Sequence, residues 1–226
     1  MNRRHALVTG ANRGIGRAVA AELRARGMAL TVTARDPAAA SDTAADLGPD
    51  VRARQLDVTD PGSVGTAAAD VGPVDVLVCN AGVLLDGGTG PLTTPLDLVE
   101  ETLRVNLLGT WRVLQAFVPG MIRRGWGRVV VVSSGTTAEF GGALFAGAPG
   151  YSLSKSALNG LTTLVAGQTA GTGVLVNAVN PGRVRTRMMP RTTTPPEVPA
   201  RFIADVASLP AGGPTGQFLT ERHLPR

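Results

Sequence analysis

The sequence predicts one α/β domain in which a doubly wound parallel sheet lies between two layers of helices. Short apolar runs alternate along the chain with segments whose apolar residues recur at helical spacing. The first apolar run leads directly into a glycine-rich turn, and no repeat or long linker divides the 226 residues. Alternating strands and helices form a parallel sheet covered on both faces, so we expect a single three-layer α/β/α domain.

The strands and helices are expected from these runs in order. Strands are predicted at residues 5–9, 28–34, 51–56, 74–78, 128–132, 174–179 and 217–220. Helices are predicted up to Gly27, at residues 61–71, 96–121 and 196–207, and around Tyr151. Residues 96–121 form the longest periodic segment.

The composition is that of a globular protein from a reducing compartment. Hydrophobic residues make up 43% of the chain and charged residues 17%, which is typical of a folded domain. No apolar run approaches the roughly 18 residues of a membrane span, and the first strand leaves no room for a targeting peptide. Cys79 is the single cysteine and cannot form an internal disulfide. We therefore expect a cytoplasmic protein that does not span a membrane.

The charge and the metal-binding residue types exclude two further classes. The net charge is +5 and the isoelectric point about 10.8, but the arginines are spread along the chain and no basic helix carries interleaved aromatics. We expect no nucleic-acid partner. Two histidines and one cysteine make a zinc site or a Ser-His-Asp hydrolase hard to assemble, so we expect no metal.

The glycine-rich turn after the first strand has the context of a dinucleotide site, because a strand precedes it and a helix follows. Its glycines allow a tight turn, a close approach of a pyrophosphate to the backbone, and close packing of the helix. The N–H groups at the start of the helix then face the phosphate. The candidate cofactor-binding residues here are Gly10, Asn12, Arg13, Gly14, Ile15 and Gly16.

The end of the second strand indicates which dinucleotide is bound. Asp36 stands where an acidic residue would hold the ribose 2′-hydroxyl of NAD, but Pro37 follows it directly. Proline at the first position of a helix makes Asp36 its N-cap, and we favour this interpretation. Arg35 and Arg13 are then placed to bind a 2′-phosphate. The expected cofactor is NADP(H), with NAD(H) as the alternative.

Tyr151 and Lys155 are the only tyrosine and the only lysine in the chain. On a helix their spacing puts both side chains on one face, one turn apart. A fixed ammonium near a phenol lowers the pKa of the phenol, which suits an acid–base pair. A surface pair on an amphipathic helix is the plainer alternative, and the remaining motifs decide between the two.

Taken together, the motifs resemble the short-chain dehydrogenase/reductase family in its compact form, which has a Rossmann fold. They occur in order as T-G-x-x-x-G-I-G, N-A-G, Asn106, Ser-Ser, Y-x-x-x-K and P-G-x-x-x-T, and span nearly the whole chain. The Thr-Ala-Arg-Asp end of the second strand and the Gly-Pro-Thr-Gly segment near the end of the chain look like the NADPH-dependent carbonyl reductases. The resemblance implies a nucleotide-binding half at about residues 1–95 and a catalytic and substrate half at about 96–226.

This resemblance also implies roles for single residues in the interconversion of a ketone or aldehyde with an alcohol. Tyr151 is the general acid, Lys155 lowers its pKa and binds the nicotinamide ribose, and Ser134 or Ser133 polarises the substrate oxygen. Asn106 anchors a water that connects Lys155 to solvent. Other cofactor contacts are implied for Asp57, Val58, Asn80, Ala81, Gly82, Pro181, Gly182, Val184 and Thr186. The family usually forms homodimers or homotetramers through the helices that contain Asn106 and Tyr151.

Three departures from the family pattern are visible. Cys79 replaces an asparagine, and we interpret it as a small core residue rather than a reactive thiol. The spacing from Ser134 to Tyr151 is four residues longer than usual, which we expect to enlarge the loop at the pocket mouth. The segment after Thr186 is short, which predicts an open pocket and tolerance of bulky carbonyl substrates. The alternatives are an NAD-dependent alcohol dehydrogenase and a protein that senses NADP(H) without turnover.

Overall fold

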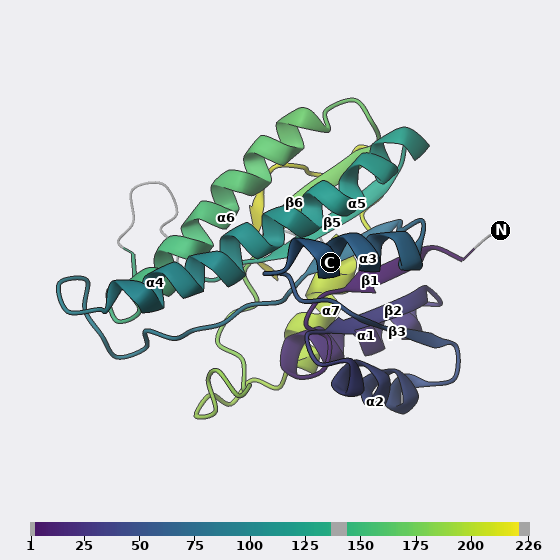
Figure 1. Cartoon of the computed structure of the whole chain (residues 1–226). Helices are drawn as coiled ribbons and strands as arrows, with labels where there is room; N and C mark the ends of the chain where they lie inside the picture. Colours follow the sequence, from purple (N-terminus) through teal and green to yellow (C-terminus); the bar gives the residue numbers. More distant parts are fainter. Residues whose placement is uncertain (1–2, 137–143, 222–226) are drawn as a thin grey trace.

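The computed structural model describes residues 3–136 and 144–221, and in this part of the chain the fold is a parallel sheet of seven strands (Figure 1). All six neighbouring strand pairs are parallel. The strand order is β3-β2-β1-β4-β5-β6-β7. The strands are β1 His5–Val8, β2 Ala29–Ala34, β3 Val51–Gln55, β4 Val76–Cys79, β5 Gly127–Val132, β6 Val174–Val179 and β7 Phe218–Leu219.

The strand order reverses between β1 and β4, and this is what creates the site. The chain runs outward from β1 to β3 and then returns to place β4 on the other side of β1. The loops that follow β1 and β4 therefore leave the sheet in opposite directions and open a crevice at its carboxyl edge. In parallel sheets of this kind, ligands bind at that crevice.

Helices cover both faces of the sheet, so the fold has the three layers expected from the sequence. One layer contains α1, α2 and α7, whose apolar residues form one buried cluster with the strands. The other layer contains α3, α5 and α6, which pack in a second cluster. The bounds are α1 Gly14–Ala25, α2 Pro37–Leu47, α3 Pro61–Val71, α4 Leu96–Leu103, α5 Thr110–Arg124, α6 Pro149–Gln168 and α7 Glu197–Val206.

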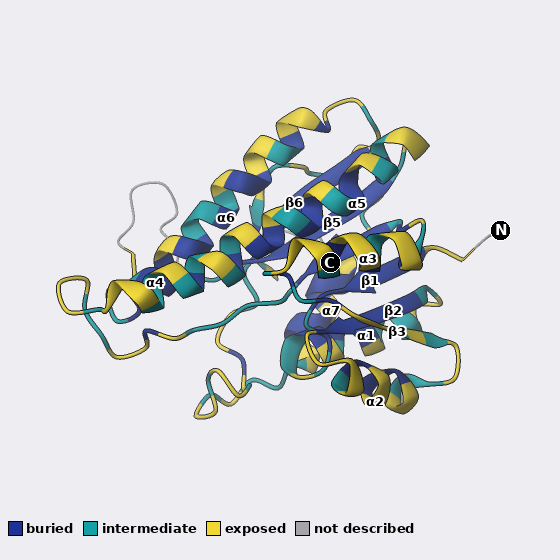
Figure 2. Ribbon diagram, viewed as in Figure 1, coloured by how far each residue is buried: buried dark blue, intermediate teal, exposed yellow. Residues whose placement is uncertain are grey.

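Central strands are buried on both faces, which explains their continuous apolar sequences. In β4, Val76 and Val78 face the α1/α7 layer, whereas Leu77 and Cys79 face the α5/α6 layer. The central strands are dark in Figure 2, and the helices show exposed residues on their outer sides. None of the helices in the described part of the chain is long and apolar enough to cross a membrane.

The long helix predicted at residues 96–121 is not continuous. It consists of α4, a π-helical turn η1 at Arg104–Gly109, and α5, which continues to Arg124 with Pro119 inside it. A π-helical turn holds one extra residue per turn and shifts the face that the following residues present. The apolar spacing on either side of the turn resembles that of one helix, which is why the sequence predicted one.

The aspartate cap that was expected at the start of α2 is present. Asp36 caps α2 and its carboxylate accepts a hydrogen bond from the N–H of Ala38 at 2.9 Å. Asp60 caps α3 in the same way through the N–H of Gly62. The prediction that Asp36 is an N-cap is confirmed.

Candidate active site

The glycine-rich turn after β1 has the backbone conformations that its glycines were expected to supply. Gly10 and Gly14 have φ angles of 61° and 53°, in the left-handed region that other residues rarely adopt. A Cβ at Gly10 would lie 3.0 Å from the Cα of Ala81, in the loop after β4. A Cβ at Gly16 would overlap the Asn80 amide and the Gly10 carbonyl. The turn is thus fitted to the loop after β4.

The start of α1 is suited to bind a phosphate group. Arg13 is the N-cap residue, and in the described part of the chain no side chain caps the N–H groups of Gly14 and Ile15. By contrast, α2 and α3 are capped by aspartates. An uncapped helix start that follows a glycine turn presents free N–H donors and the positive end of the helix dipole. These residues fit the pyrophosphate of a dinucleotide.

Two polar side chains join the turn to the end of β4. Asn80 Nδ2 donates to the carbonyl oxygens of Thr9 and Gly10, each at 3.0 Å. The Thr9 hydroxyl accepts from the N–H groups of Asn80 and Ala81 at 3.0 and 3.1 Å. In this structure the Asn80 amide holds the glycine turn in place, and Thr9, the first residue of the T-G-x-x-x-G-I-G motif, does the same.

The loop after β6 reaches the glycine turn from the other side. A Cβ at Gly14 would lie 3.2 Å from Cγ2 of Thr186. Val184 is buried and forms an isolated bridge with Thr194. Asn180 Oδ1 accepts from the N–H of Gly182 at 2.9 Å and so shapes the turn through Pro181.

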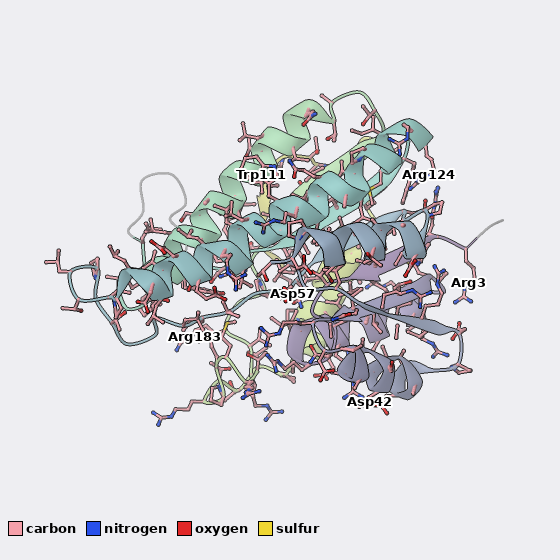
Figure 3. The ribbon with its side chains drawn as sticks, in the orientation of Figure 1. Arg3, Asp42, Asp57, Trp111, Arg124 and Arg183 are labelled. Atoms are coloured by element: carbon pink, nitrogen blue, oxygen red, sulfur yellow. The ribbon has the colours of Figure 1, made fainter. Side chains whose placement is uncertain are left out.

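A cavity of about 640 Å³ lies at the carboxyl ends of β6 and β7, against α7. Its lining does not include Tyr151 or Ser134, so it adjoins the site described below rather than forming its centre. Figure 3 labels Arg183, one of its lining residues, on the loop after β6. The lining residues are Asn180, Pro181, Gly182, Arg183, Thr194, Val198, Pro199, Phe202, Thr220 and Glu221.

Charged residues gather where the adenosine end of a dinucleotide would lie. Arg35 is exposed, and its positive charge acts on Asp57. Asp57 Oδ1 accepts from the N–H and hydroxyl of Thr59 at 2.9 and 2.7 Å. Burial raises the pKa of Asp57, but the Thr59 hydrogen bonds, Arg35 and Arg104 together hold this pKa below its usual range. Asp57 is labelled in Figure 3 and follows β3 as expected.

Val58 next to Asp57 is a packing residue. It is 7% exposed, and a Cβ at Gly109 would overlap its side chain. The π-helical turn therefore covers the Val58 side chain, and a ligand could contact Val58 through its backbone.

Tyr151 lies in the first turn of α6 and is 8% exposed. The Ser134 hydroxyl acts on the Tyr151 phenol and lowers its pKa. Ser133 points elsewhere, and its hydroxyl donates to the carbonyl oxygen of Lys155 at 3.3 Å. Of the two serines, this arrangement favours Ser134 as the partner of the Tyr151 phenol, and its role toward a substrate stays a prediction.

The pKa of Tyr151 differs from the sequence expectation. Burial raises this pKa above its ordinary value of 10.0, and the Ser134 hydrogen bond only partly offsets the effect. Lys155 Nζ lies 5.6 Å from the centre of the Tyr151 ring and donates to the Val132 carbonyl at 2.8 Å. Burial lowers the pKa of Lys155 itself from 10.5 to about 8. Burial thus raises the pKa of the Tyr151 phenol, and it also lowers the pKa of Lys155, the cation that was expected to lower the pKa of the phenol.

Asn106 lies in the π-helical turn and is completely buried. Its Oδ1 accepts from the N–H of Val83 at 2.8 Å. Its Nδ2 donates to the Val83 carbonyl and to the Ser154 hydroxyl, each at 2.9 Å. Neighbouring groups engage the amide oxygen and both amide hydrogens, so the side chain fixes the backbone after β4. The water between Asn106 and Lys155 stays a prediction.

Gly82 lies between the side chains of Asn106 and Lys155. A Cβ on it would lie 3.2 Å from Asn106 Oδ1 and 3.6 Å from Lys155 Nζ. The N-A-G motif therefore contacts the glycine turn through Asn80 and Ala81, and the Asn106–Lys155 pair through Gly82.

Cys79 is part of the core, as expected. It is 3% exposed, and burial raises the pKa of its thiol to about 12. Residues 137–143 of the enlarged loop between Ser134 and Tyr151 lie outside the described part of the chain. Among the described residues, no three His, Cys, Asp or Glu side chains are grouped so as to hold a metal ion.

The fold and this crevice define a dinucleotide-binding α/β protein, and comparisons with known proteins identify its family. Residues 4–196 match the family model described as short chain dehydrogenase. The chain is 36% identical over 192 residues to the 3-oxoacyl-[acyl-carrier-protein] reductase FabG of Aquifex aeolicus, covering 80% of this chain and 74% of that protein. It is 35% identical over 195 residues to the oxidoreductase UcpA of Salmonella typhimurium, covering 81% and 70%.

Solved structures give the same result. The crystal structure of an actinorhodin polyketide ketoreductase with NADPH matches with a TM-score of 0.86 at 30% identity, covering 97% of this chain and 95% of that one. The chain belongs to the short-chain dehydrogenase/reductase family and is an oxidoreductase of that family. Members among its structural neighbours bind NADPH or NADH.

Burial of Lys155 predicts an unusual pH dependence of stability. Below about pH 8 the lysine is charged in both folded and unfolded protein, so the cost of burying its charge is fully present. From about pH 8 to 10.5 the folded protein loses this proton and the unfolded chain keeps it, so the cost is relieved as the pH rises. We expect the free energy of unfolding of wild type, minus that of Lys155→Met, to increase by about 3 kcal/mol across this window.

Urea unfolding of both proteins at stepped pH values measures this difference. The effect of Cys79 cancels because both proteins contain it, and below pH 10 Tyr151 stays largely protonated in the folded and the unfolded protein. A difference in the free energy of unfolding between the two proteins that stays constant from pH 7 to 10 would contradict a lowered pKa of the buried Lys155.

Proposed function

We propose that the protein is an NADP(H)-dependent reductase that converts a ketone or aldehyde to the alcohol. The observation that carries the proposal is that buried Tyr151 and Lys155 and half-buried Ser134 lie together at the sheet edge where the glycine turn lies. A non-catalytic sensor of NADP(H) would not need a phenol, a hydroxyl and an amine assembled beside the cofactor crevice.

Each residue of the group has one task in this reaction. When bound, the nicotinamide supplies the hydride. The Ser134 hydroxyl binds the substrate oxygen together with Tyr151 and stabilises the negative charge that develops there. The Tyr151 phenol donates its proton to that oxygen. The raised pKa keeps the Tyr151 phenol protonated at neutral pH, and this is the form that can donate a proton in the reduction.

Lys155 helps to replace the proton that Tyr151 donates to the substrate. Its pKa of about 8 lies close to neutral pH, so its ammonium can release and regain a proton without a large cost. Its neighbour Gly82 leaves room for the amine to face the cofactor crevice. The main-chain carbonyl of Asn106 is the group we propose for the connecting water.

The names of two relatives indicate a narrower class of substrate than carbonyl compounds in general. The FabG relative acts, by its name, on a 3-oxoacyl group carried by a protein, and the structural neighbour is a polyketide ketoreductase. Both names describe a ketone on an acyl chain. We place this protein among reductases of such ketones, with an open pocket formed by the short segment after Thr186, and in the cytoplasm.

Replacement of Tyr151 tests the reaction class. Tyr151→Phe removes the proton donor and keeps the ring, so we expect kcat to fall by about 10²-fold or more with the affinity for NADPH retained. Loss of absorbance of reduced nicotinamide is followed with a panel that includes a 3-oxoacyl thioester, simple ketones, aldehydes and quinones. Tight NADPH binding by the wild type with no panel member reduced would favour the sensor alternative.

Arg35 is the proposed ligand of the 2′-phosphate, supported by its exposure and by the commitment of Asp36 to capping α2. We expect Arg35→Ser to weaken NADPH binding by about tenfold or more and to leave NADH binding nearly unchanged. Titration of intrinsic or cofactor fluorescence measures both affinities. Arg123→Ser is the matched control, since Arg123 is exposed on α5 away from the crevice. Equal affinities of wild type and Arg35→Ser for NADPH would place the phosphate elsewhere.

A homodimer or homotetramer is proposed through α5 and α6, which run side by side over one face (Figure 1). These helices expose apolar side chains, including Trp111 at 42% and Leu164 at 70%. Figure 3 labels Trp111 on α5. A hollow of about 200 Å³ lies between Leu108, Trp111, Arg112 and Gln115, where a side chain from a second copy would fit.

Light scattering tests this assembly. We expect a mass at least twice that of the 23.1 kDa chain, and a shift toward one chain in Trp111→Arg, because a charge in an apolar interface is costly. A wild-type mass equal to a single chain would remove the proposed interface.

A further inference from the structure

Asp86 is a carboxylate that the proposed chemistry does not use, and it is completely buried. It lies in the loop between β4 and α4, seven positions from Cys79 at the end of β4. Its Oδ2 accepts from the N–H of Gly150 at 2.5 Å and from the N–H of Tyr151 at 3.3 Å. Its Oδ1 accepts from the same Tyr151 N–H at 3.3 Å. Burying a carboxylate is costly unless such donors compensate it.

These hydrogen bonds are those that an N-cap side chain normally makes. The N-cap residue of α6 is Ala148, which has no side chain able to accept a hydrogen bond. Gly150 and Tyr151 are the second and third residues of the helix, since it begins at Pro149. Asp86 therefore caps the helix from a distant loop, and its negative charge faces the positive end of the helix dipole.

Gly150 makes the close contact sterically possible. A Cβ at this position would lie 3.1 Å from Asp86 Oδ2 and 3.2 Å from the Cα of Val99 on α4. Such distances are shorter than ordinary side-chain contacts, so a larger residue would push the carboxylate away from the helix. The loop after β4 and the start of α6 are thus fitted to each other.

The other side of the Tyr151 backbone is held from the same loop. The Ser154 hydroxyl donates to the Tyr151 carbonyl at 2.7 Å and accepts from Asn106, which in turn binds both polar groups of the Val83 backbone. Asp86 accepts a hydrogen bond from the Tyr151 N–H, and Ser154, which is itself held by Asn106, donates one to the Tyr151 carbonyl. Val83 and Asp86 both follow the N-A-G motif at the cofactor crevice.

We propose that Asp86 is a positioning residue for Tyr151, which sets the place of the phenol relative to the cofactor-binding loop after β4. The inference rests on the proposed function, because it assigns Tyr151 the role of proton donor. Proton donation to a bound carbonyl requires the phenol to be placed to within a fraction of an ångström. A carboxylate that ties the acid's own backbone to the cofactor loop gives that placement.

Four proteins test the proposal: wild type, Asp86→Asn, Asp86→Ala and the control Asp60→Ala. Asparagine keeps an oxygen that accepts from both N–H groups, whereas alanine leaves them unpaired. Asp60 caps α3 in the same manner but far from the phenol in the sequence and on another helix, so its loss reports the effect of removing a cap. We expect Asp86→Ala to lower kcat by about tenfold or more with the KM for NADPH little changed. We expect Asp86→Asn to stay within about threefold of wild type.

A second readout does not depend on turnover. Tyr151 is the only tyrosine, so the ultraviolet band of tyrosinate reports its ionisation without overlap from other tyrosines. In wild type we expect the midpoint above 10, because the pKa of Tyr151 is raised. In Asp86→Ala the phenol becomes less buried and the midpoint falls toward 10, whereas Asp86→Asn and Asp60→Ala keep the wild-type value. Circular dichroism in the same titration records whether each protein stays folded.

The outcomes separate the two proposals. If wild type reduces no carbonyl compound, the proposed function fails, and the tyrosinate midpoints decide the role of Asp86 by themselves. The positioning role is overturned if Asp86→Ala keeps the wild-type kcat and midpoint, or if asparagine and alanine reduce kcat equally. Should Asp86→Ala fail to fold, Asp86→Glu takes its place, because the longer side chain moves the oxygens away from the two N–H groups, and the same loss of kcat is expected.

Discussion

The arrangement of the site depends on the buried amide of Asn106. Its three hydrogen bonds satisfy both polar groups of the Val83 backbone and connect them to Ser154 on α6. A buried amide with all its partners stabilises one geometry, while a partly satisfied one is costly. The loop that leaves β4 is thereby fixed to the helix that carries Tyr151 and Lys155. The π-helical turn at Arg104–Gly109 is what brings this side chain to that point.

Two separate parts of the protein are joined at the carboxyl edge of the sheet. Thr9 and Asn80 tie the glycine turn to the loop after β4, and Asn106 ties this loop to α6. A dinucleotide held by the turn and a proton donor held by the helix are therefore positioned against a common loop. Contact with one common loop keeps the distance between the dinucleotide and the proton donor fixed, whereas two separate supports would each add their own error in position.

The sequence predicted the layers of the fold and most of the residues at the crevice. The central strands were recognisable because they are buried on both faces, and the glycine turn because its conformations need glycine. The cap at Asp36 followed from the adjacent Pro37. These features depend on neighbouring residues, which a sequence displays directly.

Features that depend on distant contacts could not be predicted. The π-helical turn keeps an apolar spacing close to that of an α-helix, so residues 96–121 read as one helix. The choice between Ser133 and Ser134 depends on which face of the sheet edge α6 covers. The side chain of Asn106 is used by Val83, twenty-three residues away, and the cap on α6 comes from a loop more than sixty residues earlier. The pKa of Tyr151 likewise depends on burial, which the Y-x-x-x-K spacing does not reveal.

The burial of the only lysine has a consequence for the chemistry of the protein surface. All other basic side chains in the chain are arginines or histidines, and Lys155 is only 4% exposed. No lysine amine is therefore presented on the folded surface to acetylation, ubiquitin transfer or amine-coupling reagents. The exposed positive charge is carried by guanidinium groups, which stay protonated at any pH that a folded protein tolerates. The positive charge that the arginine side chains carry is thus nearly independent of pH, while the one lysine amine, whose pKa burial lowers to about 8, is enclosed at the site.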